Sequence, residues 1–111
     1  FCFLTGEDQT AVAYNANGGQ GCISVTANVA PKLCAQMQAA CANQQFQDAL
    51  DLQLRLMPLH QALFMEPSPA GVKYACSLLG LSEASCRLPI VELTDGTKSA
   101  IESAMRGLEL I

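Results

Sequence analysis

The sequence is poor in charged and aromatic residues. Only 14% of its 111 residues are charged and 5% are aromatic, with no tryptophan, whereas about a quarter of an ordinary domain is charged. We therefore expect further chain or a partner subunit to cover much of its surface. The net charge of −4 and the lack of any basic run argue against nucleic acid as a partner. No apolar stretch is long enough to span a membrane, and the first residues do not resemble a signal peptide, so we expect no membrane partner.

Metal-binding and redox motifs are also missing. None of the six cysteines forms a Cys-x-x-Cys pair, which predicts free thiols in a reducing cytoplasm and neither a metal nor a cofactor. These cysteines are Cys2, Cys22, Cys34, Cys41, Cys76 and Cys86. The single histidine, His60, is interpreted as a structural residue. The adjacent Glu7 and Asp8 resemble an acid/base or metal pair, but at a helix start they more often compensate the helix dipole.

The chain predicts two strands followed by a series of helices. Apolar runs at residues 1–5 and 21–25 indicate buried strands. Because the first run looks like the middle of a buried strand, it also predicts a segment of a longer chain. Helical periodicity and cap signals predict helices at about 8–17, 30–42, 46–65, 69–79 and 95–106.

Several residues are expected to set the limits of these helices. Gly18 should end the first helix in a left-handed conformation, and Pro31 suits the first turn of the second. Pro58 predicts a kink or break near residues 54–58. Ser68 should cap the following helix with Pro69 at its first position, and Thr94 or Asp95 should cap the last helix.

The run from Gly18 to Pro31 reads as a βα unit, and enzymes built from such units bind ligands at the carboxyl ends of their strands. Polar residues Ser24, Thr26 and Asn28 lie at that end. They either line the mouth of a site or cap the next helix, and the residues leave both readings open.

No residue of the chain has the setting of a catalytic lysine. Lys32, Lys73 and Lys98 all lie on predicted helices instead of at strand ends, so we interpret them as surface or interface charges. Tyr14 and Tyr74 are interpreted as packing residues.

Three runs together resemble the 4-hydroxy-tetrahydrodipicolinate synthase (dihydrodipicolinate synthase) family. They are residues 18–31, Arg-Leu-Met-Pro-Leu-His at 55–60 and Glu-Pro-Ser-Pro-Ala-Gly-Val-Lys at 66–73. Shorter matches at 4–8, 79–81 and 87–89 extend the resemblance over the whole chain in one register.

The resemblance implies an α/β fold, the C-terminal portion of a TIM (β/α)8 barrel followed by an α-helical domain. Residues 1–44 would be the last two βα units and residues 45–111 the helical domain. The family, commonly a homotetramer, makes an intermediate of lysine biosynthesis by condensing pyruvate with aspartate semialdehyde through a lysine Schiff base. That lysine matches no position here, so the segment alone is expected to be inactive.

The resemblance assigns a substrate-binding role to two residues. Gly6 matches a glycine beside the active site after the seventh strand, and Ile23 matches an eighth-strand isoleucine that lines the pyruvate site, partly through its carbonyl. Two alternatives stay open. One is another pyruvate-dependent class I aldolase such as N-acetylneuraminate lyase, and the other is a non-catalytic helical oligomerisation module.

Overall fold

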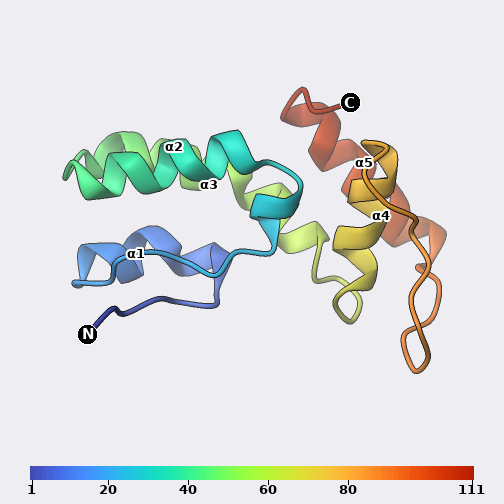
Figure 1. Ribbon diagram of the computed structural model, residues 1–111. Helices are drawn as coiled ribbons and strands as arrows, with labels where there is room; N and C mark the ends of the chain where they lie inside the picture. The colour runs from blue at the N-terminus through green and yellow to red at the C-terminus, as the bar shows by residue number, and fades with distance from the viewer. The chain divides into compact units, whose positions relative to one another are not determined.

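The computed structural model describes all residues from Phe1 to Ile111, and its regular elements are helices joined by extended segments and loops (Figure 1). Its elements in chain order are η1 (Asp8–Thr10), α1 (Ala11–Ala16), η2 (Thr26–Asn28), α2 (Pro31–Ala42), α3 (Phe46–Ala62), α4 (Ala70–Leu78) and α5 (Asp95–Gly107), where η marks a short 3-10 helix. The chain forms two compact units, unit 1 (Phe1–Met57) and unit 2 (Pro58–Ile111), and α3 runs from one into the other. None of the helices is both long and apolar enough to cross a membrane.

The two predicted strands are wrong as strands. Residues 1–5 and 21–25 meet only in an isolated parallel bridge between Thr5 and Cys22. The Thr5 amide donates to the Gly21 carbonyl at 3.0 Å, and the Ile23 amide donates to the Thr5 carbonyl at 2.8 Å. A parallel pair with no further strand on either edge does not propagate a ladder. The parallel direction predicted by the βα reading is present.

Helix α1 is shorter than the predicted helix at 8–17. The chain first makes η1, which Glu7 caps by accepting a hydrogen bond from the Gln9 amide at 3.0 Å. The α-helix then ends at Ala16, and Gly18 follows with a φ of 99°. A residue with a β-carbon is strained in this left-handed conformation, so the prediction for Gly18 is confirmed.

Helix α2 lies within one residue of its predicted bounds, and α3 begins at the predicted residue but ends three residues before the predicted end at 65. Helix α2 starts with Pro31 in its first turn, as predicted. Helix α3 ends at Ala62, and its backbone stays helical through Pro58, so the predicted break does not occur. Beyond the proline the Leu63 amide still donates to the Leu59 carbonyl at 3.0 Å. The buried side chains of Leu56 and Leu59 on either side of Pro58 hold this part of the helix in place.

Unit 2 is built on the packing of α4 against α5. Helix α4 begins one residue later than predicted, because Pro69 takes the cap position and the predicted Ser68 cap is absent. Thr94 caps α5, as one of the two predicted candidates, and accepts from the Thr97 amide at 3.4 Å. The largest side chains buried in this unit are Leu59, Leu63, Ile101, Met105 and His60.

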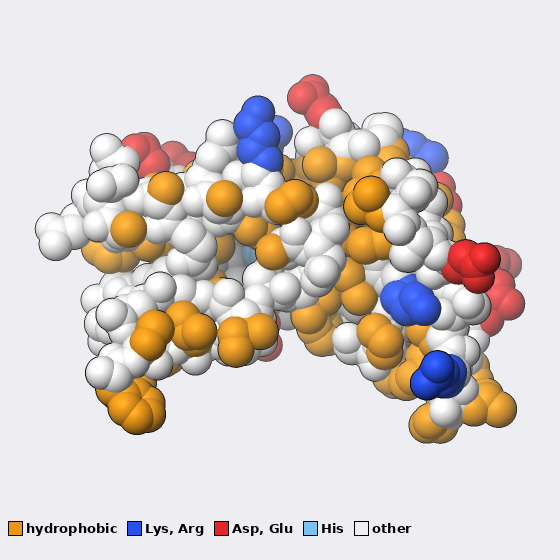
Figure 2. All heavy atoms as spheres, viewed as in Figure 1, with side chains coloured by type: hydrophobic (Ala, Val, Ile, Leu, Met, Phe, Trp, Pro, Cys, Tyr) orange, Lys and Arg blue, Asp and Glu red, His pale blue; other side chains and the backbone are white.

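Both units also expose large apolar side chains, and hydrophobic atoms are visible over much of the surface (Figure 2). In unit 1 these include Phe1, Phe3 and Leu4, which lie close together in the N-terminal segment. In unit 2 Leu88 is 83% exposed. Such exposure is typical of surfaces that contact other protein. The division into residues 1–44 and 45–111, which rests on the family resemblance, stays a prediction.

Candidate functional site

The carboxyl ends of the two paired segments meet around a buried aspartate. Asp8 follows the first segment and is only 4% exposed. Its Oδ1 accepts a hydrogen bond from the Ser24 hydroxyl at 2.5 Å and from the Cys22 thiol at 3.8 Å. Its Oδ2 accepts from the amides of Val25 at 2.9 Å and Thr26 at 3.1 Å. The carboxylate thus supplies acceptors to the first turn of η2, which is where helix geometry leaves amides without a partner.

This role of Asp8 differs from the prediction that Asp8 serves its own helix start. Glu7 caps η1 instead, while the Asp8 side chain reaches a segment 16 to 18 residues later in the chain. The sequence reading missed the contact because nothing local to Asp8 signals a partner at that separation.

The two residues assigned to substrate binding lie at this same end. Gly6 and Ile23 each follow a partner of the Thr5 and Cys22 bridge by one position. Ile23 is 72% exposed, so its side chain is not part of the core of unit 1. A β-carbon added at Gly6 would meet no atom within 4 Å. The fold therefore brings the two together at an open edge, and their contact with a substrate stays a prediction.

The polar residues after Ile23 act mainly on the backbone. The Ser24 hydroxyl accepts from the Ala27 amide at 2.9 Å, and the Asn28 amide group donates to the Val25 carbonyl at 3.0 Å. Thr26 is fully buried. The reading that these side chains cap the next helix is wrong for α2, whose cap position Ala30 has no side-chain hydrogen bond. The contacts lie instead within residues 24–28, around η2.

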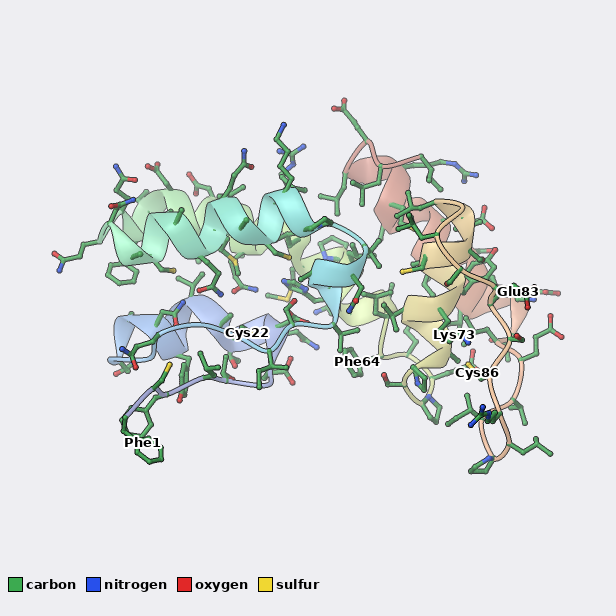
Figure 3. The ribbon with its side chains drawn as sticks, in the orientation of Figure 1. Phe1, Cys22, Phe64, Lys73, Glu83 and Cys86 are labelled. Carbon is green, nitrogen blue, oxygen red and sulfur yellow. The ribbon has the colours of Figure 1, made fainter.

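A cavity of about 230 Å³ lies beside Asp8 and is bordered by Cys22, Ser24 and Cys34, with Cys22 on the segment between α1 and η2 (Figure 3). Burial, followed by the Asp8 charge, raises the pKa of the Cys22 thiol to about 11, and the same two causes raise that of Cys34 to about 11. Both thiols are therefore protonated near neutral pH, and a protonated thiol is a poor nucleophile and a poor metal ligand.

No group of three potential metal ligands occurs in the chain, and all six cysteines are free.

The three lysines lie on helices, as predicted: Lys32 on α2, Lys73 on α4 and Lys98 on α5. Lys73 donates to the Ser85 carbonyl of the loop that also carries Cys86 (Figure 3). Lys98 pairs with Glu92 at 2.6 Å, and this contact raises the pKa of the lysine. A raised pKa is the opposite of what an imine-forming amine requires.

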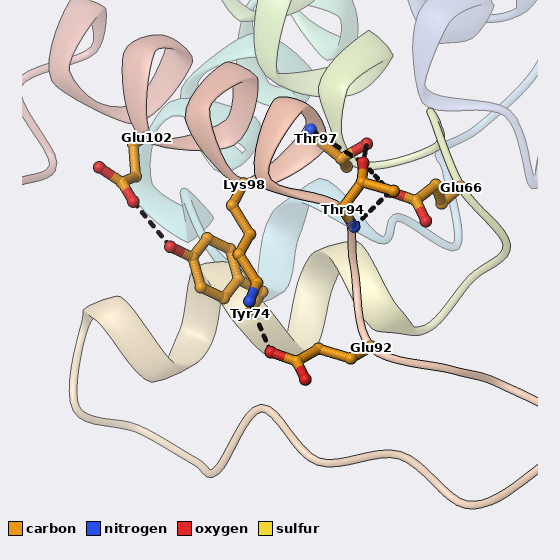
Figure 4. Close-up of polar contacts among 7 residues, drawn as sticks. All are labelled: Glu66, Tyr74, Glu92, Thr94, Thr97, Lys98 and Glu102. Carbon is orange, nitrogen blue, oxygen red and sulfur yellow. Dashed lines mark hydrogen bonds and ion pairs between the residues drawn. The ribbon is translucent and has the colours of Figure 1, made fainter.

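The remaining polar groups of unit 2 are joined in pairs (Figure 4). The Tyr74 hydroxyl donates to Glu102 at 2.7 Å, and this hydrogen bond raises the pKa of the phenol. Tyr74 and Lys98 border a cavity of about 430 Å³ whose lining is mostly apolar. His60 is fully buried in unit 2, which fits its predicted structural role. In unit 2 the Tyr74 hydroxyl is thus engaged by Glu102 and the Thr94 hydroxyl by Glu66, at 2.9 Å.

In the other unit, Tyr14 is half-buried and its ring lies against Gly19. This position agrees with the packing role predicted for the tyrosine.

Comparison with known proteins gives one consistent family. A model of the dihydrodipicolinate synthetase family matches residues 1–107. The 4-hydroxy-tetrahydrodipicolinate synthase of Cereibacter sphaeroides is 57% identical over 111 residues, covering 100% of this chain and 38% of the relative. That of Rhizobium meliloti is 58% identical over 106 residues, covering 96% of this chain and 36% of the relative.

Solved structures agree with this result. Dihydrodipicolinate synthase from Thermotoga maritima superimposes with a TM-score of 0.97 at 32% identity, covering 100% of this chain and 38% of that one. The chloride-inhibited enzyme from Acinetobacter baumannii, solved in complex with pyruvate, gives a TM-score of 0.94 at 32% identity and the same coverage. The chain spans about 38% of the length of the curated relatives that it matches over its whole length. Because the family model covers nearly every residue and the identity exceeds half, the chain belongs to the dihydrodipicolinate synthetase family.

Proposed function

We propose that residues 1–111 are the C-terminal part of a lysine-biosynthesis synthase that condenses pyruvate with aspartate semialdehyde. In this proposal residues 1–44 are the last two βα units of a (β/α)8 barrel and residues 45–111 are its helical domain. The 57% identity over all 111 residues to a named synthase carries the proposal. The parallel bridge between Thr5 and Cys22 supports it, because neighbouring strands of such a barrel are parallel.

The proposed chemistry uses a lysine from outside these residues. That lysine forms a Schiff base with pyruvate, and the protonated imine accepts the electron pair of the carbanion that then attacks the aldehyde. Gly6 and Ile23 form one wall of the pyruvate site. None of Lys32, Lys73 and Lys98 serves in this proposal, since each lies on a helix and not at the end of a paired segment. The complete enzyme acts in the cytoplasm as a homotetramer.

Borohydride trapping tests the reaction type. The test enzyme is the complete chain, with the region before Phe1 supplied by the Cereibacter sphaeroides relative. With pyruvate and borohydride we expect one labelled lysine, which peptide mapping places before Phe1. A stable adduct on Lys32, Lys73 or Lys98, or no adduct at all, would contradict the proposal.

The aldehyde separates this synthase from related aldolases. We expect turnover with pyruvate and aspartate semialdehyde and no more than a trace with sugar-derived aldehydes, which a lyase of the N-acetylneuraminate type would use. The contribution of Ile23 is tested by Ile23→Ala, for which we expect the KM for pyruvate to rise about fivefold. Leu54→Ala, which truncates another exposed apolar side chain of unit 1, is the matched control and should leave KM unchanged.

A further inference from the structure

We propose that Asp8 is a positioning residue that sets the place of Ile23, and with it the pyruvate wall, through the backbone at residues 22–26. This inference rests on the proposed function and adds a residue to it. Asp8 itself touches no reacting atom in this proposal. It acts by holding the two residues that flank Ile23 in the chain.

The Asp8 carboxylate contacts the residues directly before and after Ile23 in the chain. Oδ1 accepts from the Cys22 thiol before Ile23 and from the Ser24 hydroxyl after it. Oδ2 binds the next two amides, so the chain is held continuously up to η2. With its amide bound to the Thr5 carbonyl at 2.8 Å, Ile23 has little freedom to shift.

Asp8 is in turn held by α3. The Gln53 side chain donates to the Asp8 carbonyl at 3.0 Å and accepts from the Val12 amide at 3.3 Å. Gln53 is itself buried. Residue 8 is therefore fixed by its main chain while its carboxylate fixes residues 22–26, which makes it the link between the interior of unit 1 and the exposed edge at Ile23.

An asparagine at position 8 distinguishes the side-chain contacts to Cys22 and Ser24 from the contacts to the Val25 and Thr26 amides. Its remaining oxygen can still accept from the Val25 and Thr26 amides, but its amide group offers no acceptor to the Ser24 hydroxyl or the Cys22 thiol. Asp8→Asn thus removes the acceptor at the two contacts beside Ile23, where its amide group can only donate in the reverse direction to the Ser24 oxygen, and keeps the more distant pair. Because a displacement of about 1 Å at a positioned group is enough to weaken a site strongly, the effect should reach pyruvate binding.

The experiment measures kinetics and pyruvate trapping on the complete enzyme defined above. For Asp8→Asn we expect the KM for pyruvate to rise about tenfold, with kcat within about threefold and the KM for the aldehyde within about twofold. The pyruvate concentration that half-saturates borohydride trapping should rise by the same factor. Ser24→Ala, which removes one of the two released contacts, should raise KM about threefold, and Ser24→Thr, which keeps the hydroxyl, should restore it.

Thr94→Ala is the matched control for a purely structural effect. It removes the cap of α5 in unit 2, so it lowers the unfolding midpoint while leaving both KM values unchanged. If the Asp8→Asn enzyme does not fold, the KM values of the Ser24→Ala and Ser24→Thr enzymes test the positioning role instead. An unmodified enzyme that traps no pyruvate overturns the proposed function and this role with it. An active enzyme whose Asp8 and Ser24 variants lower the midpoint but keep the KM for pyruvate within twofold overturns the positioning role alone.

Discussion

Replacing Gly71 by alanine tests the closest backbone approach in unit 2. An added β-carbon would lie 2.4 Å from the Leu63 carbonyl oxygen and 3.0 Å from its carbon, so the two segments would have to separate by about 1 Å to reach ordinary contact. The Leu63 backbone cannot move easily, because its amide is hydrogen-bonded to the Leu59 carbonyl and its side chain is only 1% exposed. Such overpacking costs about 1–3 kcal/mol. The better helix propensity of alanine offsets up to about 1 kcal/mol.

The net loss of about 1 kcal/mol should lower the unfolding midpoint of the complete enzyme by about 2–4 °C, measured by circular dichroism during heating. Gly96→Ala is the matched control, because it lies near the start of α5 and an added β-carbon meets nothing within 4 Å. We expect its midpoint to stay level or rise by about 1–3 °C. A Gly71→Ala enzyme that is as stable as the Gly96→Ala enzyme would refute the contact between Leu63 and the start of α4.

Three further substitutions test individual interactions in the same enzyme. Hydrogen bonds from the Thr97 hydroxyl and then the Thr94 amide lower the pKa of Glu66. The unmodified enzyme should therefore be more stable than the Glu66→Gln enzyme by its full margin above about pH 4.5, and this margin should disappear as the pH falls further. Burial raises the pKa of Cys34 from 9.0 to about 11. The difference in stability between the unmodified enzyme and the Cys34→Ala enzyme should therefore be full below pH 9 and shrink between pH 9 and 11. A difference that stays constant over this range would contradict the raised pKa. Gln53→Leu leaves two buried backbone groups without their partner, and denaturant unfolding should show a loss of about 2–5 kcal/mol, against a negligible loss for Gln47→Leu on the exposed side of α3.

Local chemistry was sufficient to predict most of the helices. Pro31 in the first turn of α2, Thr94 at the cap of α5 and Gly18 after α1 are all where the sequence places them. Each of these residues acts on the few residues beside it, so its effect can be read from the sequence. Pro58 shows the limit of such rules, since the buried neighbours of the proline keep α3 continuous where propensity alone predicts a break.

The strands and the site depended on distant partners. Apolar character at residues 1–5 predicts a buried strand, but Phe1, Phe3 and Leu4 are exposed in the structure. Strand formation also needs paired neighbours, and only one bridge forms here. Gly6 and Ile23 could be assigned through the family resemblance and not through their own chemistry. Asp8 escaped prediction because its donors lie far along the chain and none of them forms a motif with it.

The aspartate also explains why polar residues follow the second segment. Three backbone hydrogen bonds join residues 3–5 to residues 20–23, and none of them reaches beyond Ile23. A carboxylate that accepts from Ser24, Val25 and Thr26 continues the connection beyond Ile23, and charged acceptors make stronger hydrogen bonds than carbonyls do. Tolerance to substitution after Ile23 should therefore follow hydrogen-bonding capacity and not strand propensity. At position 25 the main-chain amide, and not the side chain, binds Asp8, so isoleucine should replace valine without effect. Proline has no amide hydrogen, so we expect Val25→Pro to displace Ile23, as we expect of Asp8→Asn.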